Sequence, residues 1–177
     1  MASILKVNTI QDATNSTTAI SVASDGRTTF TTQPQITTPI CFQASRIDSG
    51  GTGKQGTIIF NTTYVNLGGG YDSSTGKFTA PINGTYHFNF HCFTAGNTGG
   101  AALGSGSTFA AKFQVDSSDP TGQQKSYVNI SANNYANVSM DYIVTLSASQ
   151  DVLVYVTDSY LYSDTTAWNQ FSGRLIG

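Results

Sequence analysis

The side chains in this sequence with the most potential for metal binding or nucleophilic chemistry are two histidines and two cysteines, His87, His91, Cys41 and Cys92. His87 and His91 lie four residues apart in a stretch that alternates like a β-strand, so their side chains share one side and stand about 13 Å apart. That separation is too long for one chain to hold a metal ion between them. Cys92 follows His91 directly, and neighbouring strand residues point to opposite faces, which argues against a histidine-activated thiol.

Carboxylates are the other groups that can support catalysis. All ten acidic residues are aspartates, and they are dispersed along the chain. Glycoside hydrolysis needs two carboxylates at a fixed separation. Many of these aspartates lie instead in turn sequences, where an Asp side chain bonds to the backbone. We therefore expect no enzymatic activity.

The composition narrows the choice of partners and of compartment. Charged residues make up 10% of the chain, against about 25% in ordinary soluble proteins. The eight basic residues are scattered in a chain of net charge −2, so no nucleic-acid binding is expected. The start MASILKVNTIQD lacks a secretion leader, and no stretch approaches the ~20 apolar residues of a membrane span. We expect folding in a cytoplasm without membrane insertion, and free thiols at both cysteines.

One stretch, YDSSTGKFTAPINGTYHFNF from Tyr71 to Phe90, carries the strongest strand pattern. Residues 85–93 alternate, so one face of this strand is expected to enter the core with Tyr86, Phe88, Phe90 and Cys92. Scarce helix formers and abundant β-branched and turn residues predict an all-β chain. The expected strands of the main domain, residues 40–177, are 40–46, 57–66, 77–82, 85–94, 108–116, 125–131, 137–147, 151–157 and 168–176. Their spacing is that of a sandwich or jelly roll.

Residues 1–39 differ from the rest of the chain. Short apolar alternations are separated by turn sequences and followed by the connector PQITTP, whose prolines do not fit a central strand. Such a segment has too little apolar surface to fold alone. We expect a short extended β stem in which identical copies wrap together and share one axis through Leu5, Val7, Ile10, Ile20, Val22 and Phe30. A flexible leader is the alternative.

The central stretch, together with FSGRLIG at residues 171–177, resembles the complement C1q globular head and the wider tumour-necrosis-factor-like jelly rolls. This resemblance covers 40–177 and implies a homotrimeric, ten-stranded jelly roll of two sheets. It implies a final strand made of Phe171, Ser172, Gly173, Leu175 and Ile176, which lies beside the 85–93 strand in the inner sheet. Arg174 departs from the family pattern, which usually has an aromatic or large apolar residue there.

The resemblance also implies where subunits meet. Inner sheets of such trimers face neighbouring subunits, so a trimer interface is expected at His87, Asn89, His91 and Phe93. Three copies of one histidine on the threefold axis are a further option for a metal or an anion. We expect no cofactor. Complement-type heads sometimes bind calcium, however, so calcium sites at Asp116 and Asp119, or at Asp158 and Asp164, are the alternative.

The N-terminal pattern LKVNTI, followed by a polar turn, an alternating stretch and SDG, resembles the opening segments of phage fibre proteins, especially those of cyanophages. We therefore expect a virion protein, made in the host cytoplasm, whose residues 1–39 attach to other virion proteins. Its head would bind a host surface glycan or protein, through Tyr160, Tyr162 and Trp168 unless these fill the core or an interface. The alternatives are a structural virion protein without receptor binding, such as a capsid decoration or tail assembly component, and a bacterial surface or spore-coat lectin.

Overall fold

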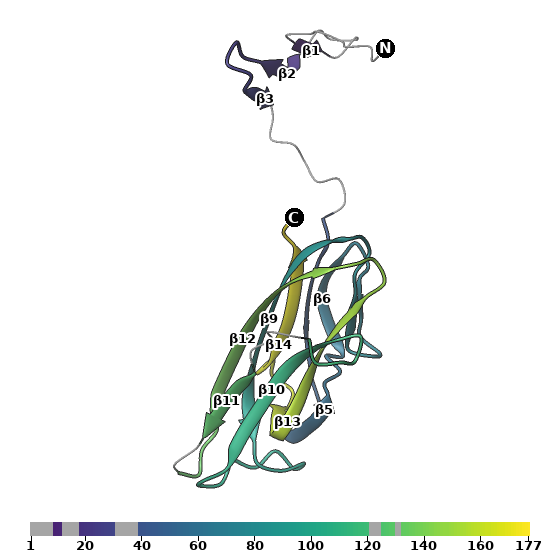
Figure 1. Ribbon diagram of the computed structural model, residues 1–177. Coiled ribbons are helices and arrows are strands. Elements are labelled where there is room, and N and C mark those ends of the chain that lie inside the picture. The colour runs from purple at the N-terminus through teal and green to yellow at the C-terminus, as the bar shows by residue number, and fades with distance from the viewer. Residues whose placement is uncertain (1–8, 12–17, 31–38, 121–124, 130–131) are drawn as a thin grey trace. The chain divides into compact units, whose positions relative to one another are not determined.

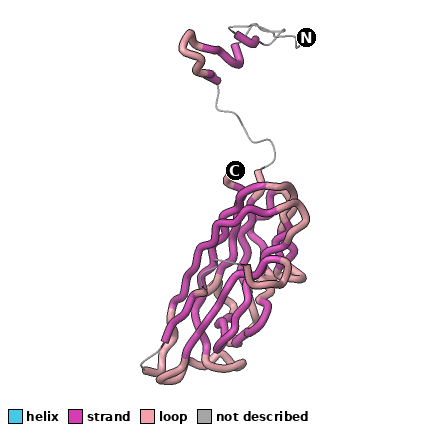
Figure 2. The backbone as a smooth tube through the Cα atoms, viewed as in Figure 1, coloured by secondary structure: helices cyan, strands magenta, loops and turns pink. Residues whose placement is uncertain are grey.

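The computed structural model describes residues 9–11, 18–30, 39–120, 125–129 and 132–177. The chain forms two compact units, Met1–Thr37 and Thr38–Gly177. The described residues contain strands and no helix (Figure 2). Among them, accordingly, no helix has the length and apolar character needed to cross a membrane.

The first unit contains a small antiparallel sheet in the order β1 (Thr9–Gln11), β2 (Thr18–Val22) and β3 (Thr28–Phe30). Ile10 pairs with Ile20, and Ile20 pairs with Phe30, so the three strands align these positions in one row. Ile10 is 52% exposed and Val22 is 42% exposed. Of the other residues expected on a shared axis, Leu5 and Val7 lie outside the described residues, as does the side chain of Phe30.

The second unit is an all-β jelly roll whose long strands run along its length (Figure 1). One layer, the inner sheet, has the order β12-β9-β14-β4-β6, and the other is built on β11, β10 and β13, with β5 and β8 also pairing with β13 and β7 pairing with β8. The described strands of this unit are β4 (Cys41–Ser45), β5 (Thr52–Thr57), β6 (Thr62–Leu67), β7 (Tyr71–Asp72), β8 (Lys77–Thr79), β9 (Gly84–Ala95), β10 (Thr108–Val115), β11 (Ser126–Asn129), β12 (Asn137–Leu146), β13 (Asp151–Ser163) and β14 (Gln170–Leu175).

Three expected strands are wrong in their extent. The range 77–82 is too long, because β8 ends at Thr79. The range 57–66 is not one strand, because the chain leaves β13 after β5 and crosses to the inner sheet before β6 begins. Ile58 and Phe60 are fully buried in this crossing and give it the alternation of a strand. The range 151–157 is too short, since β13 continues to Ser163 through an irregularity at which Ser159 takes a φ of 54°.

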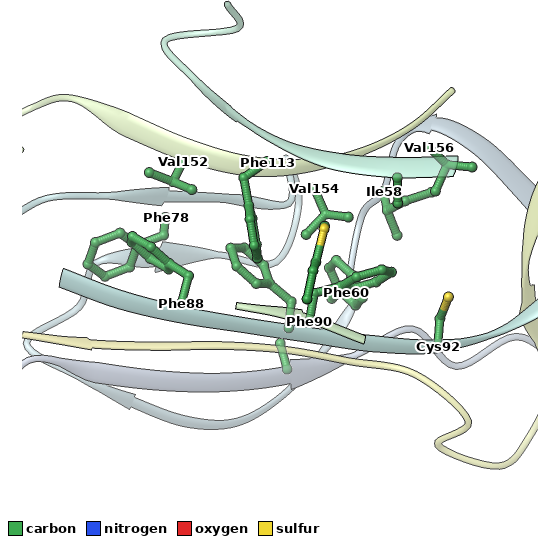
Figure 3. Packing of buried hydrophobic residues seen from close by; sticks show 14 of the residues in the cluster. Ile58, Phe60, Phe78, Phe88, Phe90, Cys92, Phe113, Val152, Val154 and Val156 are labelled. Atoms are coloured by element: carbon green, nitrogen blue, oxygen red, sulfur yellow. The ribbon is translucent and has the colours of Figure 1, made fainter. Parts of the chain in front are cut away.

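The core lies between the two layers and is rich in aromatic rings. Tyr86, Phe88, Phe90 and Cys92 of β9 have no exposed surface, which confirms the predicted inward face of this strand. Figure 3 shows Phe88 and Phe90 meeting side chains of the opposite layer. A fully buried Phe side chain removes about 150–250 Å² from water, so these rings dominate the burial that holds the layers together.

The final strand also lies where it was expected. β14 pairs with β9 on one side and with β4 on the other, in the inner sheet. Gly173 is opposite Phe88, and a Cβ atom there would approach the Phe88 ring to 2.5 Å and the Phe42 ring to 2.7 Å. Glycine thus allows two aromatic rings to pack directly against this strand. Ile176 follows the strand, and its amide donates to Thr85 O at 2.8 Å.

Candidate functional site

The side of the inner sheet that faces away from the core, here called the outward face, carries two rows of side chains that cross all five strands. Residues directly opposite each other in antiparallel strands project to the same side. In order from β12 to β6, the first row is Ile143, His87, Arg174, Cys41 and Leu67. The second row is Asp141, Asn89, Ser172, Gln43 and Val65.

Asp141 links the two rows on the β12 side. His87 Nε2 lies 2.8 Å from Asp141 Oδ1, and Asn89 Nδ2 donates to the same oxygen at 3.2 Å. The Asp141 side chain is nevertheless 62% exposed, whereas that of His87 is 27% exposed. The carboxylate is therefore anchored at the edge strand and still open to an external partner.

Arg174 lies on the other side of His87 and is exposed. Within the described part of the chain, its guanidinium makes no hydrogen bond or ion pair. It borders a hollow of about 420 Å³ on the outward face, whose other lining residues include Cys41, Gln43, Val65, His87 and Ser172. The departure from the family pattern at Arg174 thus places a free positive charge beside a hollow.

The four residues expected at a trimer interface occupy two places. His87 and Asn89 belong to the rows of the outward face, and His91 lies in the next row between Ser139 and Gln170. Partial burial lowers the pKa of His91 below its ordinary value. Phe93 lies at the far end of β9, among aromatic rings. Contact of these residues with a second subunit stays a prediction.

A cluster of four aromatic rings, here called the distal aromatic cluster, surrounds that end of β9. Phe93 is 5.0 Å from Trp168 and 6.4 Å from Tyr135, and Tyr135 is 5.3 Å from Tyr162 between ring centroids. Tyr135 and Trp168 are each 38% exposed. Strand β9 begins where Thr85 N bonds Gly177 O, so the cluster lies at the opposite end of this unit from the C-terminus (Figure 1).

The structure brings together two of the three residues expected to bind a receptor, because Tyr162 and Trp168 belong to the cluster. Tyr160 lies on β13, where it pairs with Ala95 of β9, and within the described residues its ring contacts no other aromatic ring. Sequence reasoning missed Tyr135 because it precedes β12 in a segment without strand alternation. Its hydroxyl donates to Gly100 O at 2.9 Å, which ties it to the loop after β9.

Asp164 is the charged residue at the edge of the cluster. Its carboxylate accepts hydrogen bonds from Tyr162 OH at 3.0 Å and from Thr166 N at 2.6 Å. Partial desolvation opposes ionisation, but bonds from Thr166, Trp168 and Tyr162 outweigh it and lower the pKa of Asp164. A carboxylate at the edge of exposed rings is an arrangement that can accept hydrogen bonds from a hydroxyl-rich ligand.

The aspartates raised as calcium ligands already have protein partners in three of four cases. Asp116 accepts bonds from Asp151 N and Gln150 Nε2, and Asp119 pairs with Lys112. Asp164 bonds as described above, and Asp158 lies on β13 opposite Ala110. In the ranges that the structure describes, no group of three or more His, Cys, Asp or Glu side chains is placed to hold a metal ion.

Both cysteines are free, as expected. Cys92 is fully buried, and burial raises the pKa of its thiol. Cys41 is half-buried on the outward face, where it lines the hollow beside Arg174. The two thiols therefore differ in access to solvent.

Comparison with known proteins agrees with the fold. The model of the C1q domain family matches residues 41–176. Among solved structures, the globular domain of zebrafish complement 1qA protein aligns with a TM-score of 0.59 at 19% identity, over 78% of this chain and 98% of that one. Eiger TNF from S. frugiperda aligns with a TM-score of 0.56 at 11% identity, over 79% and 94%. Murine APRIL aligns with a TM-score of 0.58 at 8% identity, over 78% and 99%.

These structural likenesses extend across nearly the whole of each similar domain and concern the fold. The family match spans β4 to β14, which form both sheets, and it includes all four residues of the distal aromatic cluster. The chain belongs to the C1q domain family.

Proposed function

We propose that the chain is a homotrimeric virion fibre or spike protein whose jelly-roll head binds a host surface glycan. The observation that carries the binding role is the distal aromatic cluster, with its exposed Tyr135 and Trp168. Tyr and Trp rings combine an apolar face with a polar edge, which suits contact with sugar rings and their hydroxyl groups. Catalysis is not part of the proposed function.

The position of the cluster supports an adhesive role. Ile40 O accepts a bond from Leu175 N, so the chain enters this unit at the end where β9 begins. The cluster lies at the other end of β9, around Phe93. A head attached at its entry end would present the cluster away from the attachment.

Trimer formation would make weak contacts sufficient for adhesion. C1q and tumour-necrosis-factor-like domains commonly bind their partners as trimers, and this chain shares their fold. Three linked sites raise the apparent affinity because the second and third contacts become intramolecular. The exposed apolar and charged groups of the outward face provide a surface for such self-association.

Residues 1–39 serve in this proposal as the stem that attaches the head to other virion proteins. A small sheet needs a covered hydrophobic face to be stable by itself in water. The row of Ile10, Ile20 and Phe30 crosses the small sheet, and Ile10 remains half exposed. Three copies packed together would bury this surface.

The test is adsorption of the full chain to candidate host cells and to arrays of their surface glycans. Trp168→Ala and Tyr135→Ala should each lower binding by about tenfold or more, the scale of a lost aromatic contact. Tyr64→Ala is the matched control, because Tyr64 is 52% exposed on β6, outside the cluster. Wild-type protein that binds neither cells nor glycans, yet enters particles, would instead support a structural virion role.

A further inference from the structure

We propose that copies of this chain join head to tail, with Ile143 and Asp141 of one copy seated in the hollow beside Arg174 of the next. This inference rests on the trimer of the proposed function and specifies how its subunits meet. It assigns a partner to the exposed side chain of Ile143, the exposed carboxylate of Asp141 and the unpaired guanidinium of Arg174.

The inserting side is the edge strand β12. Ile143 is 62% exposed, an unusual state for a large apolar residue in the middle of a ten-residue strand. Asp141, two residues away on the same face, is exposed to the same degree while it keeps its bonds to His87 and Asn89. The exposed apolar side chain of Ile143 and the anchored carboxylate of Asp141 thus lie next to each other at one edge of the inner sheet.

The receiving side lies across β9, β14, β4 and β6. Cys41 and Val65 give the hollow an apolar part, and Arg174 gives it a positive charge. Val65 and Leu67 of β6 remain 37% and 49% exposed. Each property of the inserting side therefore has a complement here, apolar against apolar and acid against base.

Both sides belong to every copy but differ in place: the inserting side lies on β12, whereas the hollow extends from β9 across β14 and β4 to β6. A contact between two different patches is heterologous, and such contacts form rings when the rotation closes. Within one chain, Asp141 and Arg174 stand on opposite sides of His87 and Asn89, in separate rows. The second copy of this chain is therefore the occupant that supplies matching chemistry at both ends of the sheet.

The experiment uses charge reversal in the full chain, with oligomer mass measured by light scattering over a dilution series. Asp141→Arg and Arg174→Asp should each weaken the trimer by about tenfold or more, and the double variant should restore it, because the opposite charges are exchanged. Asp158→Arg is the matched control, since Asp158 is exposed on β13 in the other sheet. It should leave the mass unchanged.

Cys41 supplies a second readout of the same contact. It lines the hollow, so alkylation should be slow in the assembled wild type and fast in either single reversal. Cys92 is fully buried and should resist alkylation in every folded variant, which separates dissociation from unfolding.

The outcomes distinguish this contact from the trimer itself. Stable trimers in both single variants, with Cys41 reactive throughout, would overturn the Asp141 to Arg174 contact and leave the trimer standing. Weakened single variants without rescue in the double variant would also overturn the pairing. A monomeric wild type at micromolar concentration would remove both the contact and the proposed trimer.

Discussion

Arg46 and Asn169 exchange hydrogen bonds although 123 residues separate them: Arg46 N donates to Asn169 Oδ1 at 2.8 Å, and Asn169 Nδ2 donates to Arg46 O at 3.2 Å. Asn169 Nδ2 also lies 3.2 Å from Tyr162 O. The Asn169 side chain is fully buried. It therefore holds the end of β4, the end of β13 and the start of β14 together, directly beside Trp168.

Asn169→Ala should destabilise the head because it removes the acceptor of Arg46 N, and an unpaired buried backbone group costs about 1–3 kcal/mol. Trp168 is the single tryptophan of the chain, so its fluorescence reports on the same place. Urea unfolding followed by circular dichroism measures the stability, and the emission maximum of Trp168 should shift to the red. The control is Asn129→Ala, at an exposed position on β11, which should change neither. Unchanged stability in Asn169→Ala would contradict the role of this side chain as a link between three strands.

Phe88 and Phe93 lie on opposite faces of β9 and should respond differently to truncation. Phe88→Ala removes a fully buried ring from the aromatic core and should cost about 3–5 kcal/mol in unfolding free energy. Phe93→Ala removes a partly exposed ring that contacts Trp168 and Tyr135, so it should preserve the fold and reduce host binding. Unfolding and adsorption assays on both variants check this division. Equal loss of stability in the two would mean that Phe93 belongs to the core.

The faces of β9 and the place of the final strand could be predicted because both depend on local patterns. Alternation over twelve residues determines which of its side chains are buried. The crossing at Ile58 and Phe60 could not be predicted, since a buried segment that changes sheets has the same alternation as a strand. Its end depends on Asn61, whose amide bonds both Ile47 N and Ile47 O from a distant loop.

The candidate sites were harder to predict for the same reason. Tyr162 and Trp168 stood out as late aromatic residues, but their partner Tyr135 comes from the segment before β12 and meets them only in the folded chain. The rows of the outward face depend on the order of β12, β9, β14, β4 and β6, which no local pattern contains. A sequence shows which residues share a strand face, and not which strands are neighbours.

The His91 imidazole should make the head less stable in mild acid. Partial burial lowers its pKa in the folded state, so the unfolded state binds the proton more readily. The neutral His91 side chain therefore costs the folded head no stability above the unfolded pKa of about 6.5, and the stability of the head falls as the pH falls through and below that value. The side chains opposite it are uncharged, Ser139 on β12 and Gln170 on β14.

Urea unfolding at about pH 7.5 and about pH 5.5 brackets this titration. The midpoint of the wild type should fall at the lower pH, and that of His91→Gln should fall less, because glutamine cannot take up the proton. An equal fall in both proteins would assign the acid sensitivity to other groups and contradict the role of His91.

Removal of residues 1–37 should leave a head that folds and binds but no longer enters virions. The second compact unit begins at Thr38, and the family match lies wholly within it. Ile40 must be kept, because its carbonyl accepts the bond from Leu175 N that closes the end of β14. The unfolding midpoint of residues 38–177 should equal that of the head in the full chain, while incorporation into particles, measured by quantitative mass spectrometry, should be lost. A longer truncation that begins at Phe42 removes Ile40 and should lower the midpoint, which separates the structural edge of the head from the proposed stem. Incorporation of the 38–177 protein at wild-type levels would place the attachment site on the head instead.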